Sequence, residues 1–312
     1  MVRIRLTSSV LALALVFMST VLSNSADAQS TDSNESDRAK TGYQFSYTPI
    51  YQFETDLDSS GQFDVQRHFL RFDVSRSIDQ NWTVGLGLSF DYERWNFSDI
   101  TGLAGVDLWD EIFRPGISLP LFYNTGNKWM FGIIPSIEAS GATGAEVSES
   151  LSFGAVLSAS YVVRPTLILG LGVGIFNELD ESRVFPFVVI NWQINDRLRL
   201  TNPFRAGPTG PAGLELVYEP ADAWKMGIGS AYRSYRFRLD DSSAVADGIG
   251  GVDFWAPFVR VGRQIGNHYS IDVYGGALVN GSITIDDQNS NELGETDYDT
   301  APFAGLTIQG QF

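Results

Sequence analysis

The chain of 312 residues contains no cysteine, which excludes disulfides, thiol nucleophiles and cysteine-ligated metals. It has only two histidines, His68 and His268, which are too few for a histidine-based metal centre. Lys and Arg number 21 against 37 Asp and Glu, and the resulting net charge of −16 argues against a nucleic-acid partner. After residue 28 no run of about 18 apolar residues occurs, so we expect no transmembrane helix.

The N-terminal segment has the three parts of a secretory signal peptide. Arg3 and Arg5 supply the positive charge, residues 10–18 form a short apolar run, and Ala26-Asp27-Ala28 has the small-x-small form of a cleavage site. The apolar run is too short to span a bilayer comfortably. We therefore predict that residues 1–28 are removed on export.

The remainder of the chain alternates with the period of β-strands and shows no helical period. In one example Trp82, Leu86 and Phe90 fall on one face, and small or polar residues such as Gly87 and Ser89 fall on the other. The candidate strands are 42–54, 63–77, 82–94, 111–123, 129–139, 150–163, 166–177, 183–193, 197–202, 212–219, 223–239, 252–264, 269–279 and 301–312. This count predicts about 14 strands. Twelve is the alternative, because prolines interrupt the region between 202 and 212.

The connections between these strands alternate between short and long. The short ones are 78–81, 124–128, 164–165, 194–196, 220–222 and 265–268, and the long ones are 55–62, 95–110, 140–149, 178–182, 203–211, 240–251 and 280–300. Outer-membrane barrels combine tight periplasmic turns with longer external loops in this way. The pattern predicts an all-β fold, a transmembrane antiparallel β-barrel, and disfavours a soluble propeller or sandwich.

The last strand, 304–312, alternates apolar and polar residues and ends on the aromatic Phe312. In this it resembles the C-terminal strand of bacterial outer-membrane β-barrels, and Gly213–Arg238 resembles an uncharacterised group of these proteins. The resemblance implies a place in the outer membrane, contact with its lipid, and recognition by the barrel-assembly machinery through the strand that ends at Phe312. Residues 29–41 are then a flexible periplasmic lead, and 42–312 a single barrel domain.

Aromatic residues gather where the predicted strands end, as expected for two interfacial girdles. The group beside the short turns and the chain end comprises Trp82, Trp129, Trp192, Trp224, Tyr269 and Phe312. The group beside the long loops comprises Tyr51, Tyr92, Trp95, Phe113, Phe237 and Trp255.

Charged residues within the strands fall mostly on the face opposite the apolar one, which predicts that they line the lumen. The candidates are Arg67, Arg71, Asp73, Asp91, Glu93, Arg114, Glu138, Glu215, Arg236, Arg238, Arg260 and Asp272. Either these charges orient solutes in a hydrated pore, or they form ion pairs that fill the barrel. Period 2 sends Arg236 and Arg238 inward near the external mouth, and Arg233 breaks that pattern.

The favoured function is a passive or weakly selective pore for small polar solutes, lined by mixed Arg and Asp or Glu. The alternative is a closed structural or surface-recognition barrel with acidic external loops. These loops, including Asp286, Asp287 and Glu292, could also hold divalent cations, although their spacing matches no calcium loop. We expect no enzyme activity and no cofactor, because neither histidine is placed for catalysis.

Overall fold

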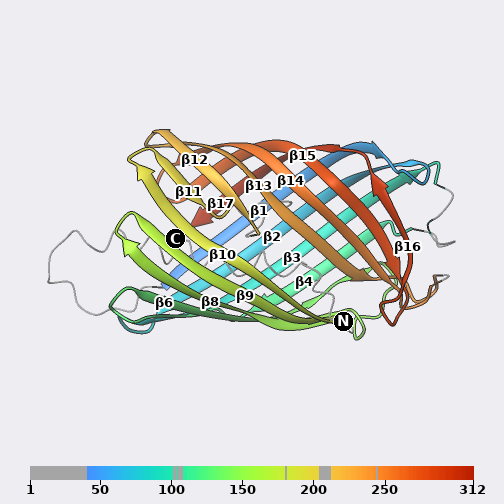
Figure 1. The fold of residues 1–312 in the computed structure, drawn as a ribbon, viewed down its shortest axis with the longest axis horizontal. Coiled ribbons are helices and arrows are strands. Elements are labelled where there is room, and N and C mark those ends of the chain that lie inside the picture. Colours follow the sequence, from blue (N-terminus) through green and yellow to red (C-terminus); the bar gives the residue numbers. More distant parts are fainter. Residues whose placement is uncertain (1–40, 101–102, 104–107, 180, 204–211, 244) are drawn as a thin grey trace.

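The structure is a computed structural model that describes residues 41–312 except 101–102, 104–107, 180, 204–211 and 244. The described residues form a single sheet of 17 segments that closes on itself, since β1 pairs with both β2 and β17 (Figure 1). All pairings but one are antiparallel, the exception being a single pair between β13 and β7. No helix of the length and hydropathy needed to cross a bilayer occurs among these residues.

The first half of the barrel consists of β1 (Thr41–Asp56), β2 (Gln62–Ser77), β3 (Trp82–Ser98), β4 (Glu111–Ser118), β5 (Leu121–Asn124), β6 (Trp129–Ala139), β7 (Gly141–Ala142) and β8 (Leu151–Arg164). The second half consists of β9 (Leu167–Glu178), β10 (Glu181–Asn195), β11 (Leu198–Thr201), β12 (Gly213–Ala221), β13 (Trp224–Arg238), β14 (Ile249–Ile265), β15 (Tyr269–Asp286), β16 (Glu292–Tyr298) and β17 (Ala301–Gln311).

Three strands of the barrel are each interrupted once. β4 and β5 both pair with β3, and β16 and β17 both pair with β15. β6 and β7 both pair with β4 and are separated only by Ser140. Counting each interrupted strand once gives a closed barrel of 14 strands, which confirms the predicted number and fold class.

The outward face of the barrel is apolar. Leu88, Leu171 and Val259 are 44%, 69% and 58% exposed, although each lies in the middle of a strand. At the end that carries the short turns, hereafter the turn end, Trp129 and Phe312 are also exposed. A water-exposed surface of this kind would be unfavourable, so the exposed band is a surface for lipid.

At the opposite end, hereafter the loop end, part of the barrel closes into a smaller ring. β13 pairs with β12 only as far as Ala231 but stays paired with β14 up to Arg238. There it meets Gly141 of β7, while Leu57 at the end of β1 pairs with Tyr298 of β16. The loop-end ring therefore runs through β1, β2, β3, β4, β7, β13, β14, β15 and β16.

Large apolar side chains fill the loop-end ring. Phe63, Trp95, Phe237 and Phe254 are at most 2% exposed and belong to one buried cluster. The ring of Trp109 packs edge-on against Phe237, with 4.5 Å between the ring centroids. The positions of Trp95 and Phe237 near strand ends predicted that both belong to an interfacial girdle. The structure shows that they do not. They lie on the inner face, and the end of β13 has moved inward to meet β7.

The wall opposite the ring, made of β8, β9 and β10, has an apolar inner face of its own. Phe185 and Phe187 of β10 lie over Gly174 and Gly172 of β9, and a Cβ at either glycine would overlap the ring. These glycines let two aromatic rings lie flat on the sheet. The wall is therefore packed from within by the two rings of β10 and by Phe176 of β9, which stacks on Phe185.

The hairpin of β15 and β16 lengthens the barrel wall at the loop end. The sequence predicts a long loop at 280–300, yet β15 runs to Asp286 and pairs with β16 from Glu292 onwards. The polarity of these residues suggested a loop. Strands that lie within the ring and beyond the apolar band can be polar, so polarity alone did not mark the strand end.

Candidate functional site

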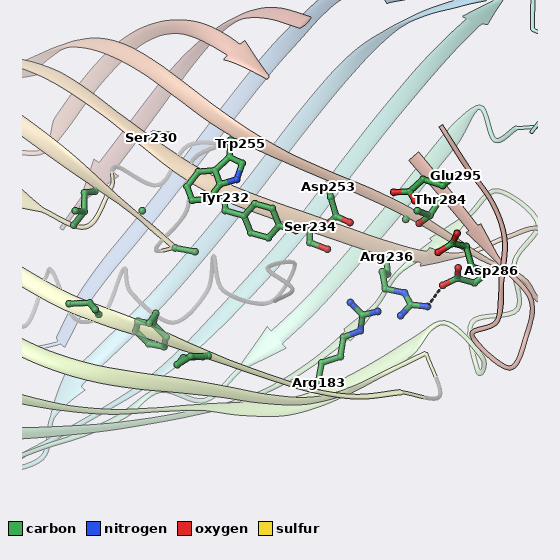
Figure 2. Close-up of a pocket in the computed structure, with 18 of the residues that line it drawn as sticks. Arg183, Ser230, Tyr232, Ser234, Arg236, Asp253, Trp255, Thr284, Asp286 and Glu295 are labelled. Carbon is green, nitrogen blue, oxygen red and sulfur yellow. Dashed lines mark hydrogen bonds and ion pairs between the residues drawn. The ribbon is translucent and has the colours of Figure 1, made fainter. Parts of the chain in front are cut away.

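A cavity of about 1130 Å³ lies between the wall and the loop-end ring, at a gap between β10 and β13 (Figure 2). From Glu181 to Ile190 β10 pairs with β9 on one edge, and among the described residues no strand pairs with its other edge. β13 beyond Ala231 likewise pairs with β14 alone until it reaches β7. The cavity is therefore bounded by two sheet edges that face one another.

The cavity-lining residues of β13 occupy the same face of the strand as its lipid-facing residues. β13 and β14 pair without interruption from Trp224 to Arg238. Every second residue of β13 therefore lies on the same face, and these residues are Met226, Ile228, Ser230, Tyr232, Ser234 and Arg236. Ile228 is 60% exposed to the outside, whereas Ser230 and the residues after it line the cavity. The outward face of β13 thus turns from apolar to polar at the point where the strand leaves the barrel wall.

This geometry differs from the period-2 prediction for three arginines. Arg236 and Arg238 were expected on the lumen side, but Arg236 lies on the cavity side of β13, and Arg238 shares that face. Arg233, which had no explanation, is on the inner face. Its Nε and Nη2 donate to the Tyr235 hydroxyl at 3.1 and 2.8 Å. The prediction failed because β13 bends inward, so that its former lipid face becomes the wall of a polar cavity.

Two arginines meet one carboxylate at the loop end of the cavity. Nε and Nη2 of Arg183 donate to Oε2 of Glu181 at 3.1 and 2.8 Å, and Nη1 of Arg236 donates to the same oxygen at 2.7 Å. Nη2 of Arg236 also donates to Oδ2 of Asp286 at 2.9 Å. Arg183, Glu181 and Arg236 form what we call the cavity triad, and it bridges the gap between β10 and β13.

The rest of the lining is both aromatic and polar. The Tyr232 hydroxyl donates to Asp253 Oδ1 at 3.0 Å, and the Tyr232 ring lies 5.4 Å from that of Trp255. Towards the bilayer the cavity is lined by Pro186, Val188, Ile190 and Leu214, and on the wall side by Phe187. One end of the cavity is thus charged and the other apolar.

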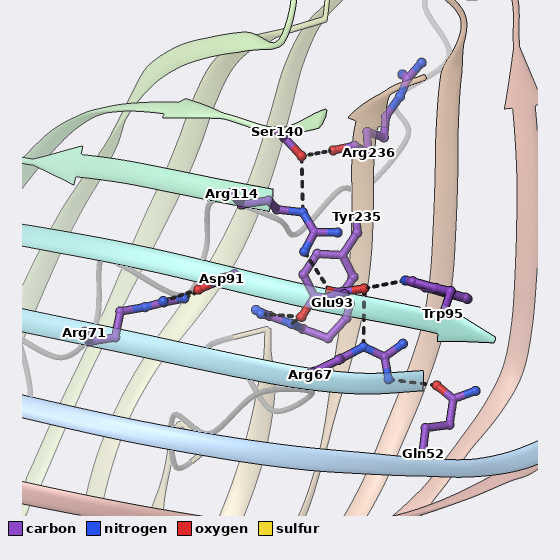
Figure 3. Close-up of polar contacts among 11 residues, drawn as sticks. Gln52, Arg67, Arg71, Asp91, Glu93, Trp95, Arg114, Ser140, Tyr235 and Arg236 are labelled. Atoms are coloured by element: carbon purple, nitrogen blue, oxygen red, sulfur yellow. Dashed lines mark hydrogen bonds and ion pairs between the residues drawn. The ribbon is translucent and has the colours of Figure 1, made fainter. Parts of the chain in front are cut away.

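A second group of two arginines and a glutamate lies inside the loop-end ring (Figure 3). Nη1 of Arg114 donates to Glu93 Oε1 at 2.7 Å, and Nε of Arg67 lies 3.6 Å from Oε2. The indole of Trp95 donates to Oε2 at 3.0 Å. We call Arg67, Glu93 and Arg114 the ring triad, and all three side chains are at most 2% exposed.

The ring triad also ties β13 to the opposite side of the barrel. The Arg114 guanidinium lies 4.7 Å from the centroid of the Tyr235 ring, and its Nε donates to Ser140 Oγ at 3.2 Å. Ser140 Oγ in turn donates to the Arg236 carbonyl at 2.7 Å. These contacts hold the end of β13 against β4 and β7, and so they close the ring.

The other predicted residues form smaller groups. Arg260 donates to Glu215 Oε1 at 2.7 and 2.9 Å and to Asp272 Oδ1 at 2.6 Å, and Arg71 makes a two-fold contact with Asp91. Arg238 donates to the carbonyls of Glu149 and Asp247, and so joins two loops. Asp73 is buried beside Gly87, and Glu138 is half-buried on the inner face of β6. A solute path along these residues stays a prediction.

His268 and the acidic turn after β15 make structural contacts. His268 Nδ1 lies 2.9 Å from the Gln311 carbonyl, and its ring stacks on Phe312. In the turn after β15, hydrogen bonds from the side chain and backbone of Asn291 hold the pKa of Asp287 below its ordinary value. The described residues contain no group of three His, Asp or Glu side chains placed to hold a metal, and the divalent-cation hypothesis finds no support among them.

Comparison with known proteins finds likeness in fold alone. No family model matches the chain, and no curated protein matches it. Among solved structures, an outer-membrane channel of Pseudomonas putida F1 is 10% identical, with a TM-score of 0.47 over 91% of this chain and 100% of that one. The P. putida toluene transporter TodX is 10% identical, with a TM-score of 0.42 over 89% and 91%. A FadL homologue of Pseudomonas aeruginosa is 12% identical, with a TM-score of 0.36 over 88% and 89%.

The chain has the fold of an outer-membrane β-barrel. Among the described residues, each strand in the turn half of the sheet pairs with a neighbour on both sides, and the apolar band faces outward as a bilayer requires.

Sequence reasoning missed much of the cavity of this barrel. It assigned no role to Arg183, Tyr232 or Trp255 as lining residues, because the two edges that bring them together are far apart in sequence. One signal was present. The residues from Ser230 onwards turn polar on the face of β13 that carries Met226 and Ile228, and such a change can mark the point where a strand leaves the bilayer.

Proposed function

We propose that the barrel is a channel and that its path to the loop side runs through the cavity between β10 and β13. The loop end then faces the outside, and small polar or amphipathic solutes pass by diffusion. The observation that carries this proposal is that the loop-end ring is filled by buried side chains such as Phe63 and Phe254, while the cavity lies beside it.

The packing of the ring favours this side path over an axial one. Conduction along the ring axis would have to displace the ring triad and the aromatic side chains around Phe237. Buried ion pairs that lose a partner leave an uncompensated charge, which costs about 3–5 kcal/mol. The cavity beside the ring leaves the ring triad and these aromatic side chains in place, and Ser230 and Thr284 are half-buried on its surface.

The absence of cysteine allows a direct test of the path. Ser230→Cys would be modified with a bulky thiosulfonate in protein reconstituted into liposomes, and the flux of a small sugar and a small amino acid would be followed. The flux should fall several-fold on modification and recover on reduction, because the added group occupies the cavity.

Ser98→Cys is the matched control, since Ser98 is exposed at the loop end of β3 and does not line the cavity. Its modification should leave the flux unchanged. Flux that persists after Ser230→Cys is fully modified would place the path elsewhere. If the wild-type protein gives neither flux nor discrete current steps in a planar bilayer, the second reading holds. That reading is a closed structural or surface-recognition barrel, and it is favoured by the filled ring.

A further inference from the structure

The cavity triad has the geometry of an anion site that the chain occupies with its own side chain. Three N–H groups from two arginines converge on one oxygen, Oε2 of Glu181, at 2.7 to 3.1 Å. Guanidinium groups bind carboxylates through paired, charge-assisted hydrogen bonds of this length. The arrangement would therefore accept any carboxylate that reaches the same position.

The three members of the triad differ in how firmly they are held. The side chains of Arg183 and Arg236 are 5% and 4% exposed, whereas Glu181 is 38% exposed. Arg236 is further fixed by Asp286, which is itself buried. The two guanidinium groups are thus preorganised, and the glutamate is the member that can leave with the least loss of packing.

We infer that Arg183 and Arg236 form a carboxylate-binding subsite, which Glu181 occupies in this structure, and that the cavity takes amphipathic monocarboxylates. The carboxylate of the solute replaces that of Glu181 on the two arginines. Glu181 then turns to the solvent, so the two arginines still bind one carboxylate between them. This substrate class rests on the proposed path through the cavity.

The apolar part of the solute has a surface that continues from the subsite. Pro186, Val188 and Leu214 line the cavity towards the bilayer, and all three are exposed on the membrane side. A chain of several carbons that lies along them would bury apolar area on both sides of the gap. The volume of about 1130 Å³ is ample for a molecule of this size.

The acidic residues of the cavity outnumber its arginines, but they give little preference for a cationic solute, because they are paired or exposed to solvent. The Asp253 carboxylate accepts the Tyr232 hydroxyl, and Asp286 accepts from Arg236. Two further carboxylates, Glu292 and Glu295, are exposed at the rim on β16 and are therefore screened by solvent. The buried charge that faces the gap is that of the two arginines.

Binding of three probes of equal chain length tests the inference. Hexanoate, hexanol and hexyltrimethylammonium would be titrated into protein in phosphatidylcholine nanodiscs and followed by calorimetry, with protein-free nanodiscs as the blank. In Glu181→Gln, where no internal carboxylate competes, hexanoate should bind at least about ten-fold more tightly than hexanol, since hydrogen bonds to charged groups carry the difference. Glu181→Gln should raise hexanoate affinity several-fold, because the internal competitor is weakened.

Arg183→Gln should lower hexanoate affinity about ten-fold and leave hexanol unchanged. Arg199→Gln is the control, since its pair with Glu219 lies at the turn end and outside the cavity. Equal affinity for hexanoate and hexanol in wild type and in Glu181→Gln would overturn the subsite, and tighter binding of the ammonium probe would assign a cation instead. Glu181→Gln decides the matter even if Arg183→Gln fails to fold.

The two proposals fail separately. Loss of the subsite would leave the flux of sugars and its block at Ser230→Cys intact. A protein with no flux can still bind hexanoate, which would mark a binding site in a barrel that does not conduct.

Discussion

The two triads have the same composition, two arginines on one glutamate, and different surroundings. The ring triad lies among aromatic side chains, and its glutamate is 1% exposed. The cavity triad lies at the mouth of a cavity, and its glutamate is 38% exposed. The same chemistry therefore serves two purposes. A carboxylate sealed in a low-dielectric core is a structural tie, whereas one at an open edge can be exchanged for that of a solute.

The difference follows from where β13 leaves the barrel wall. Its inner face, with Tyr235 and Phe237, closes the ring against β3 and β4. Its outer face, with Tyr232 and Arg236, loses contact with lipid and becomes the cavity wall. One strand thus supplies both a sealed core and an accessible site, and substitutions on its two faces, or in the two triads, should separate these roles.

The largest effect is expected at the centre of the ring triad. Glu93→Gln removes the charge that Arg67 and Arg114 share and leaves two buried guanidinium groups without it. Breaking a buried pair in this way should lower the free energy of unfolding by about 3–5 kcal/mol. Urea unfolding in detergent, followed by tryptophan fluorescence, measures this change.

Glu219→Gln is the control for that substitution, because Glu219 pairs with Arg199 at 3.5 Å and both side chains are about one-third exposed. It should change stability by less than about 1 kcal/mol. An equally small effect of Glu93→Gln would mean that water reaches the ring, and the comparison between the triads would collapse.

The next effect concerns the aromatic packing of the ring. Phe237→Ala removes the partner of Trp109 and leaves a void beside its ring, which should destabilise the barrel by about 3 kcal/mol or more. The same void removes part of the packing that blocks the passage of ions along the ring axis. We therefore expect larger and more frequent current steps in a planar bilayer than for the wild type.

Phe185→Ala is the comparison for that void, since Phe185 is buried in the cluster of the opposite wall. It should destabilise the barrel to a similar degree without opening the ring. If both variants raise conductance alike, the leak reflects general loosening rather than an opened axis.

The fold was largely predictable from sequence, because apolar residues on the lipid face of a barrel strand alternate with small or polar residues on its inner face. Leu86, Leu88 and Phe90 alternate with small or charged residues, and the short turns that follow such runs set the strand number. The C-terminal aromatic, Phe312, is correctly placed at the turn end, where its ring stacks on His268. These features depend on local pattern alone.

The site was not predictable in the same way, because it depends on where two distant strands separate. The periodicity of β13 is unbroken from Trp224 to Arg238, and only its surroundings change. A regular strand that moves from the bilayer into the interior keeps its alternation but exchanges the environment of both faces. This is why Arg233 seemed anomalous and why Arg236 was expected in the lumen.

Two arginine substitutions on the outer face of β13 should locate the point at which this face passes from lipid to the cavity, with a smaller effect on stability. Ile228→Arg places a charge on the lipid-facing side of β13 and should cost about 2–4 kcal/mol. Ser230→Arg lies one step further along the same face, where the cavity begins, and should cost less than about 1 kcal/mol. Urea unfolding of both variants in lipid vesicles measures the difference. Equal costs would show that lipid extends beyond Ser230 and that the cavity opens later along the strand.

The smallest effect on stability is expected from Glu181→Gln, the counterpart of Glu93→Gln in the cavity triad. The Glu181 side chain is 38% exposed. When the substitution removes the charge of Glu181, Arg236 keeps Asp286 as a partner. Exposed pairs contribute about 0–1 kcal/mol, so the free energy of unfolding should fall by less than about 1 kcal/mol. The measurement is the same urea titration used for Glu93→Gln. A loss comparable to that of Glu93→Gln would make the cavity triad a structural tie like the first, because a carboxylate that holds the fold together is not free to yield its place to a solute.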